Sequence, residues 1–176
     1  MSPADETSAE AATINATDPR NGEAANEVAA STEFISFAIG DEQYGVDIMA
    51  VREIKGWSGA TQLPNQPDYM RGVLNLRGIM VPIIDLRCRF GQGTTDATPL
   101  HVVIVVQVHA KTVGLLADRV LDIVAFDRSE IQAVPEVSRI AKANFLAGLV
   151  TIDGIMIALI DLDHLVSEPS ETETAE

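Results

Sequence analysis

Two stretches of the chain carry the same pattern of apolar and polar positions. Residues 72–86 read GVLNLRGIMVPIIDL and residues 148–162 read GLVTIDGIMIALIDL, so each residue of the second stretch lies 76 positions after its counterpart. In both, two apolar runs flank a two-residue polar break that ends in glycine, which is typical of two strands joined by a tight turn. The pattern therefore predicts two β-hairpins that arose by internal duplication.

The segments that precede the hairpins repeat as well. The run VGLLADRVLDI from Val113 matches YGVDIMAVREI from Tyr44 at a spacing of 69 positions. Apolar residues alternate with smaller ones over 35–39, which predicts a strand, and the apolar run over 101–108 predicts a strand buried on both faces. Each copy thus supplies about five short strands, a number typical of a small barrel.

The two copies span residues 33–90 and 100–166, on either side of a Gly- and Thr-rich linker. A unit of roughly 60 residues has a marginal hydrophobic core by itself. We therefore expect an all-β fold of two small barrels that pack face to face around one shared core. A short helical turn is expected near Ile48, another near Ser129, and a short helix from Asp161.

Two residues of the first hairpin depart from the ordinary pattern. Arg77 occupies the turn position at which the second copy has Asp153, although arginine has no turn-forming chemistry of its own. This suggests a task beyond making the turn; the alternative is a solvated turn residue. Pro82 cannot donate a hydrogen bond to a neighbouring strand, so it predicts an edge strand or a bulge.

The charge of the chain excludes two classes of partner. Its 12 Lys and Arg against 26 Asp and Glu give a net charge of −14, whereas nucleic acids and anionic membrane surfaces attract clustered basic residues. Much of the acidity lies in residues 1–32 and 167–176, which have few large apolar side chains and are predicted to be disordered tails. No run is long enough to span a membrane and no secretory signal is present, and the single cysteine, Cys88, suits a reducing compartment. These features predict a cytoplasmic protein.

The best candidates for catalytic groups are Asp85 and Asp161, because a duplication can bring two equivalent carboxylates together, as in aspartic proteases. Each follows a strand and precedes a helical turn, where an N-cap is the simpler role. The three histidines show no metal-ligand spacing, and no glycine-rich phosphate loop is present. We therefore expect a binding module that is not an enzyme and has no cofactor or metal.

The runs FISFAIGDEQYGVDIMAVREI, YMRGVLNLRGIMVPIIDLRCRF and VGLLADRVLDIV resemble the CheW-type chemotaxis coupling proteins of bacteria. The resemblance extends from about Phe34 to Val166, and the string NLRG followed by PI-x-DLR is highly specific to that family. It implies two intertwined five-stranded SH3-like barrels in an adaptor without enzymatic activity. Such adaptors join the cytoplasmic tips of chemoreceptors to the regulatory domain of the CheA histidine kinase, and they can meet other CheW-like domains in array rings.

The resemblance also implies roles for particular residues. The residues implied to contact receptors are Val51, Glu53 and Arg77. Kinase contact falls on Gly72 and Arg77 and, in the second barrel, on Gln132, Glu136 and Val137. Two of these second-barrel positions depart from the family pattern, because well-studied members have Arg and Phe where this chain has Gln132 and Val137.

Three related interpretations differ in context. The same fold occurs in the kinase's own regulatory end and in coupling proteins fused to a receiver, and a chain that ends at Glu176 is expected to be neither. A coupling protein of a non-flagellar array, serving twitching motility or cyclase control, is an alternative that the residues do not exclude. The hydrolase that would use Asp85 and Asp161 is the remaining alternative.

Overall fold

The computed structural model describes residues 31–135 and 144–167, which fold mainly into ten strands arranged in two five-stranded sheets. Barrel A has the strand order β8 (Arg119–Asp127), β1 (Ser31–Ile39), β2 (Glu42–Asp47), β10 (Ile155–Ile160) and β9 (Leu146–Ile152). Barrel B has the order β3 (Val51–Gly56), β6 (Val102–Val108), β7 (Lys111–Ala117), β5 (Ile79–Asp85) and β4 (Met70–Leu76). The short helices are η1 (Ile48–Ala50), α2 (Leu86–Arg89), η2 (Arg128–Glu130) and α3 (Leu162–Val166).

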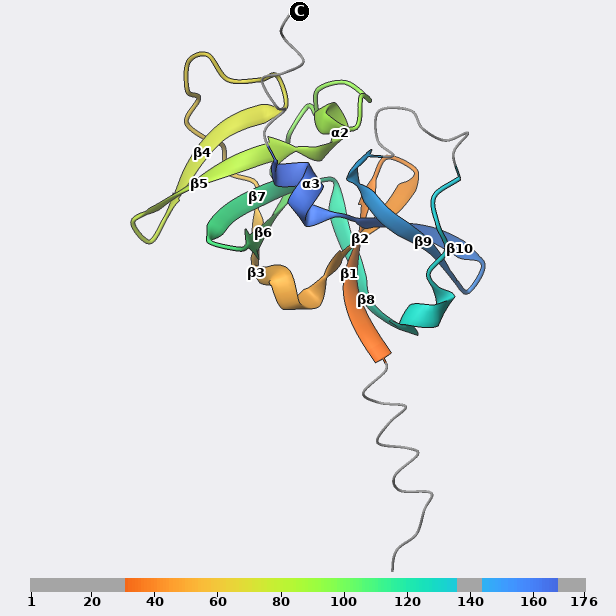
Figure 1. The fold of residues 1–176 in the computed structure, drawn as a ribbon. Coiled ribbons are helices and arrows are strands. Elements are labelled where there is room, and N and C mark those ends of the chain that lie inside the picture. The colour runs from red at the N-terminus through yellow and green to blue at the C-terminus, as the bar shows by residue number, and fades with distance from the viewer. Residues whose placement is uncertain (1–30, 136–143, 168–176) are drawn as a thin grey trace, which may run out of the picture. The chain divides into compact units, whose positions relative to one another are not determined.

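The two barrels exchange strands, so they are intertwined as the family resemblance implies. The chain passes from barrel A to barrel B at η1, and it returns at Asp118, between β7 and β8. Each barrel therefore combines strands from both sequence copies and does not coincide with residues 33–90 or 100–166. In Figure 1 the β4–β5 hairpin and the β9–β10 hairpin lie on opposite sides of this pair of sheets.

The duplication is visible in the hydrogen-bond register. In barrel A, Leu159 of β10 lies opposite Gly45 of β2 in a parallel pair, and in barrel B, Ile83 of β5 lies opposite Gly114 of β7 in the same way. These pairs are related by the spacings of 76 and 69 positions found in the sequence. The internal duplication is thus confirmed at the level of individual residue pairs.

Each barrel is closed by one short bridge. Thr61, in the loop after β3, exchanges two backbone hydrogen bonds of 2.9 and 2.8 Å with Val73 of β4. Gln132, after η2, does the same with Leu149 of β9 at 2.7 and 2.8 Å. Each bridge links the segment that follows the first strand of the sheet order to the strand at the other end, which closes the sheet into a barrel at that point.

The expected shared core lies between the barrels. The largest cluster of buried apolar side chains draws on both sheets, with Phe37 and Tyr44 from barrel A and Leu115 from barrel B among its members. Two smaller clusters fill the individual barrels. Strand β6 serves two of the three clusters, because Val103 and Val105 face the interior of barrel B while alternate residues face the shared core. Its prediction as a strand buried on both faces is confirmed.

Pro82 sits in a more interior position than its sequence suggested. Strand β5 lies between β7 and β4, so it is not an edge strand as a whole. Its pairing with β7 begins only at Ile83, one residue after the proline. At Pro82 itself, β5 pairs only with Val73 of β4. No second strand lies beside this residue to need a hydrogen bond from it, and a proline is tolerated at such a position.

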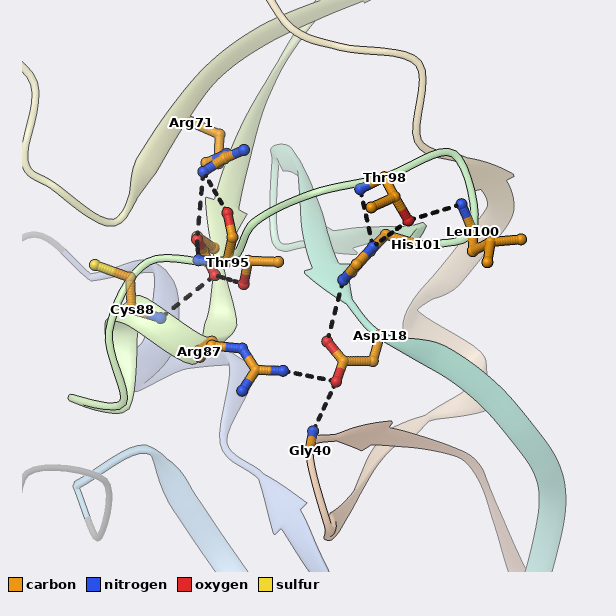
Figure 2. A network of polar contacts seen from close by, with 10 residues as sticks. Gly40, Arg71, Arg87, Cys88, Thr95, Thr98, Leu100, His101 and Asp118 are labelled. Atoms are coloured by element: carbon orange, nitrogen blue, oxygen red, sulfur yellow. Dashed lines mark hydrogen bonds and ion pairs between the residues drawn. The ribbon is translucent and has the colours of Figure 1, made fainter.

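A polar network braces the barrels where the chain returns to barrel A (Figure 2). The carboxylate of Asp118 accepts a hydrogen bond of 2.7 Å from the backbone N–H of Gly40, in the β1–β2 turn of barrel A. It also forms an ion pair of 2.6 Å with Arg87 of α2, which follows β5 of barrel B, and its other oxygen lies 3.5 Å from Nε2 of His101. One carboxylate therefore connects segments of both barrels.

This brace makes stability depend on pH. Burial by itself acts to raise the pKa of Asp118, but the Gly40 N–H and Arg87 outweigh burial, so the pKa lies below its ordinary value of 3.8. A carboxyl with a lowered pKa stabilises the fold above its unfolded-state pKa, and that contribution is lost as pH falls through the folded-state pKa. The wild-type chain should therefore lose unfolding free energy as the pH falls from about 5 to about 2. We expect Asp118→Asn to lose less over the same range. Urea unfolding at both pH values tests this, and an unchanged loss would contradict it.

A second contact between the copies centres on Arg89 of α2. Its guanidinium lies 4.0 Å from the ring centroid of Tyr69 and 4.5 Å from that of Phe145, two residues related by the 76-residue repeat. It also donates hydrogen bonds to the backbone oxygens of Leu165 and Ser167, at the end of α3. Arg89 therefore ties together both copies and fixes the end of α3.

The tails predicted over residues 1–32 and 167–176 fall almost wholly outside the described residues, and the first strand begins at Ser31. None of the helices in the described part has the length and apolar character needed to cross a bilayer.

Candidate functional site

The tips of the two hairpins are tight turns of the same kind. Arg77 and Gly78 have φ values of 53° and 88°, and Asp153 and Gly154 have 52° and 81°. Positive φ at both central residues defines the turn that matches the twist of paired strands, and it favours Asn, Asp or Gly at the first position. An arginine there is held in a sparsely populated conformation, and such positions are often functional.

Arg77 is exposed but already has a partner. Its guanidinium contacts both carboxylate oxygens of Glu53, at 2.7 Å and 3.4 Å. The sequence suggested either a partner contact or a solvated turn residue, and it gave no sign of this pairing within the chain. Glu53 belongs to β3, at the opposite end of the strand order from β4, but barrel closure brings the hairpin tip over it. Two residues predicted to contact receptors therefore form one unit at the mouth of barrel B.

Glu53 reaches this position through an irregularity in β3. The register between β3 and β6 shifts between Val51 and Glu53, and a bulge of this kind turns a side chain toward a new direction. Val51 packs against the shared core and is only partly exposed. Of the three predicted receptor contacts, Glu53 and Arg77 are thus brought together at one surface, whereas Val51 mainly supports the strand beneath them.

Exposed apolar side chains flank both tips. Ile79 and Met80 follow the first turn and are 59% and 57% exposed, and their counterparts Ile155 and Met156 are 47% and 59% exposed. We call these pairs hairpin patch 1 and hairpin patch 2. Isolated exposed apolar residues are ordinary, but the same dipeptide exposed at equivalent points of both copies indicates interaction surfaces. Reasoning from the sequence missed this, although the repeated Ile-Met after each turn glycine was the available signal.

Gly72 is buried and has no side chain, so it does not contact a partner directly. Its φ is +133°, and a Cβ built there would lie 2.2 Å from the carbonyl oxygen of Thr61. Thr61 forms the bridge that closes barrel B. An effect of Gly72 replacement on partner binding would therefore act through the barrel and its bridge.

The predicted second-barrel contacts lie only partly within the described residues. Gln132 has an exposed side chain, while its backbone forms the closing bridge with Leu149. Glu136 and Val137 fall outside the described residues.

The two repeated aspartates differ in their surroundings. Both cap the helix that follows, with Asp85 accepting from the N–H of Cys88 and Asp161 from that of His164. Asp85 is also fully buried and accepts two hydrogen bonds from Thr95, of 2.8 Å from the backbone N–H and 2.6 Å from the hydroxyl. The Arg71 guanidinium lies 3.8 Å from it. This carboxylate anchors the linker between the copies and faces no solvent-accessible site.

We expect Asp85→Asn to destabilise the protein by roughly 2–3 kcal/mol, because an amide cannot accept both Thr95 hydrogen bonds and leaves buried donors unsatisfied. Asp161→Asn is the matched control and should cost about 1 kcal/mol or less, since asparagine also caps helices. Urea unfolding of both variants measures the difference. Equal losses would show that Asp85 is only a cap.

Two of the histidines pair with aspartates, as expected of structural rather than metal-binding residues. His109 pairs with Asp163 at 2.7 Å, and His164 with Asp161 at 2.8 Å. Among the residues that the structure describes, no group of three or more His, Cys, Asp or Glu side chains is arranged to hold a metal ion.

Comparison with known proteins places this geometry in a family. A family model for the CheW-like domain matches residues 33–170. The chain is 50% identical over 143 residues to the probable chemotaxis protein CheW of Rhizobium etli, an alignment that covers 81% of this chain and 92% of that relative. It is 43% identical over 143 residues to the chemotaxis protein CheW of Rhizobium meliloti, covering 81% and 91%. The crystal structure of the scaffolding protein TtCheW from Thermoanaerobacter tengcongensis superposes with a TM-score of 0.71 at 32% identity, covering 78% of this chain and 88% of that one.

Proposed function

Because the chain belongs to the CheW-like family, we propose that it is a non-enzymatic adaptor that couples chemoreceptor cytoplasmic tips to the regulatory domain of a CheA-type histidine kinase. The observation that carries this proposal is the Glu53–Arg77 pair, held on a strained turn directly beside hairpin patch 1. An exposed charge pair next to exposed apolar side chains is the composition of a protein interface.

The receptor contact is assigned to the mouth of barrel B. There the Glu53 carboxylate and the Arg77 guanidinium present a fork of fixed geometry, which suits polar groups on a receptor helix. Val51 acts beneath them by holding β3 against the shared core. The kinase shares Arg77, and Gly72 contributes by keeping the hairpin on its bridge to Thr61.

A second contact with the kinase, or with another CheW-like domain, is assigned to barrel A. The described residues assigned to it are Gln132 and hairpin patch 2, while Glu136 and Val137, which the resemblance also implies, lie outside the described residues. The two hairpins that carry these patches lie on opposite sides of the pair of sheets (Figure 1), which would allow one chain to bind two double-barrel partners at once. This arrangement suits a ring or an extended array, with the adaptor in the cytoplasm and held near the membrane by its receptors.

The hydrolase that would use Asp85 and Asp161 has no support in the geometry. Asp85 is fully buried and bonded to Thr95, while Asp161 pairs with His164. Neither carboxylate lines the two cavities beside α3, and Asp85 has none of the solvent access that a general acid or base needs. Both serve the ends of strands and the helices that follow.

Calorimetric titration tests the proposal with two purified probes, a receptor cytoplasmic fragment and the kinase regulatory domain. The chain is expected to bind both, and to bind them together. The matched variants Met80→Glu and Met156→Glu each place a charge in one hairpin patch. Each should weaken at least ~10-fold the binding of a double-barrel partner at its own patch, while binding at the other patch is unchanged. If the wild-type chain bound neither probe, the adaptor function would be wrong.

A further inference from the structure

An apolar groove lies beside α3, at the base of the first hairpin and away from its tip. It has a volume of about 390 Å³, and its walls include Tyr69, Met70, Ile84, Val113 and Val166, with Lys111 at the rim. Met70 and Ile84 are paired at the base of β4 and β5, whereas Leu76 and Ile79 are paired at the tip. Six residues of strand separate the two ends by roughly 20 Å, so the groove is distinct from the Glu53–Arg77 pair.

The duplication provides an internal comparison for this groove. By the spacings of 69 and 76 positions, the counterparts of Val113, Val166 and Tyr69 are Tyr44, Phe90 and Phe145. The backbone confirms the correspondence, because the carbonyl oxygens of Tyr69 and Phe145 each accept a 2.7 Å hydrogen bond, from Asp85 and Asp161 respectively. The same place in the fold therefore occurs twice, with different side chains.

In the other copy this place is filled by aromatic rings. Tyr44 and Phe90 stack with a centroid distance of 4.9 Å, and Phe90 lies 6.2 Å from Phe145. Tyr44 and Phe90 are only 1% and 2% exposed. Beside α3, two valines stand where these two rings stand in the first copy. The groove is thus the space that the smaller side chains leave open.

The rim of the groove differs in charge from its counterpart. Lys111 stands at the position equivalent to Glu42, whose carboxylate accepts the hydrogen bond of the Tyr44 hydroxyl. Lys111 is exposed and makes no ion pair within the described residues. The nearby carboxylate of Asp163 is paired with His109. A ligand of this groove therefore meets mainly apolar walls, the amide side chains of Asn65 and Gln66, and the positive charge of Lys111.

We propose that this groove binds a segment of a partner protein that inserts one phenylalanine or tyrosine ring, with a carboxylate next to it that pairs with Lys111. The ring takes the place that Phe90 takes in the first copy, where the fold already shows that an aromatic side chain fits between the same backbone elements. The charge at the rim selects an acidic neighbour over a basic one. The groove is a third docking surface, separate from the hairpin patches.

The test uses the full chain, amide-resolved NMR and two tripeptides, Ac-Glu-Phe-Glu-NH2 and Ac-Glu-Ala-Glu-NH2. The phenylalanine peptide is expected to shift the amide signals of Tyr69, Val113 and Val166 saturably and to bind at least ~10-fold more tightly than the alanine peptide. Val166→Phe refills the groove with the aromatic residue of the first copy and should abolish this binding. Lys111→Glu, on the exposed rim, should weaken it about 2- to 5-fold without affecting folding.

Several outcomes would overturn the proposal. They are equal shifts with the alanine peptide, shifts that map to the hairpin patches, no saturable shift at the solubility limit, and undiminished binding to Val166→Phe. If Val166→Phe does not fold, the peptide affinities of Lys111→Glu and Lys111→Met decide the test. Unchanged affinity in both Lys111 variants would contradict the assignment of the acidic neighbour, and a graded loss from Met to Glu would support it.

Discussion

Replacing Gly72 with alanine is expected to prevent barrel B from closing and to destabilise the protein by about 3 kcal/mol or more. Two effects act together. The backbone at Gly72 has φ +133°, a region that side chains rarely adopt, and the new Cβ would lie 2.2 Å from the carbonyl oxygen of Thr61. Backbone atoms cannot move aside as a flexible side chain does, so the Thr61–Val73 bridge must break. Circular dichroism melting and urea unfolding measure the loss.

Gly78→Ala is the matched control for this prediction. Gly78 also has a positive φ, of +88°, but a Cβ there would meet no atom within 4 Å. Its replacement should cost only the backbone strain, about 1–2 kcal/mol. If both variants melted alike, the steric conflict with Thr61 would not matter. The role of Gly72 in holding the Thr61–Val73 bridge would then be contradicted.

Reversing the charge of Arg77 is expected to have the largest effect on function. Arg77→Asp suits the turn, because Asp153 occupies the same position at φ 52° in the other hairpin. The Glu53–Arg77 pair is exposed on the arginine side, so its loss should change stability by about 1 kcal/mol or less. Receptor-dependent kinase phosphorylation should nevertheless fall at least ~10-fold, because the charge presented to the partners is inverted.

A charge swap distinguishes a partner contact from a structural pair. In the double variant Arg77→Asp with Glu53→Lys, the ion pair at the mouth of barrel B is restored with reversed polarity. If the pair serves only to close the barrel, the swap should restore coupling. We expect coupling to stay lost while the melting temperature recovers, since the partners respond to the direction of the charge.

The sequence was sufficient to predict the features that repeat. The matched runs at 72–86 and 148–162 predicted both hairpins, and the shortness of each copy predicted the shared core, which lies between the barrels. The family resemblance added the exchange of strands, which local patterns do not encode. It is produced by two crossings, at η1 and at Asp118, that look like ordinary strand connections along the chain.

What the sequence missed depends on contacts between distant segments. The Arg77–Glu53 pair was missed because nothing in the sequence brings Glu53, on the far edge of the sheet, under the hairpin tip. Asp85 looked like a simple cap because its partner, Thr95, belongs to a linker with the composition of a solvated loop. The groove beside α3 was also missed. It could have been found from the aligned copies, which have valines at 113 and 166 where the other copy has Tyr44 and Phe90.

The coupling function itself is tested most directly by kinase phosphorylation in a reconstituted mixture of receptor fragments and a CheA-type kinase from the same cell. Phosphorylation is measured without the chain, with the wild-type chain and with Arg77→Asp. The adaptor function predicts that receptors raise kinase phosphorylation only when the wild-type chain is present, and that Arg77→Asp behaves like the mixture without the chain. Equal receptor-dependent phosphorylation in all three mixtures would contradict it.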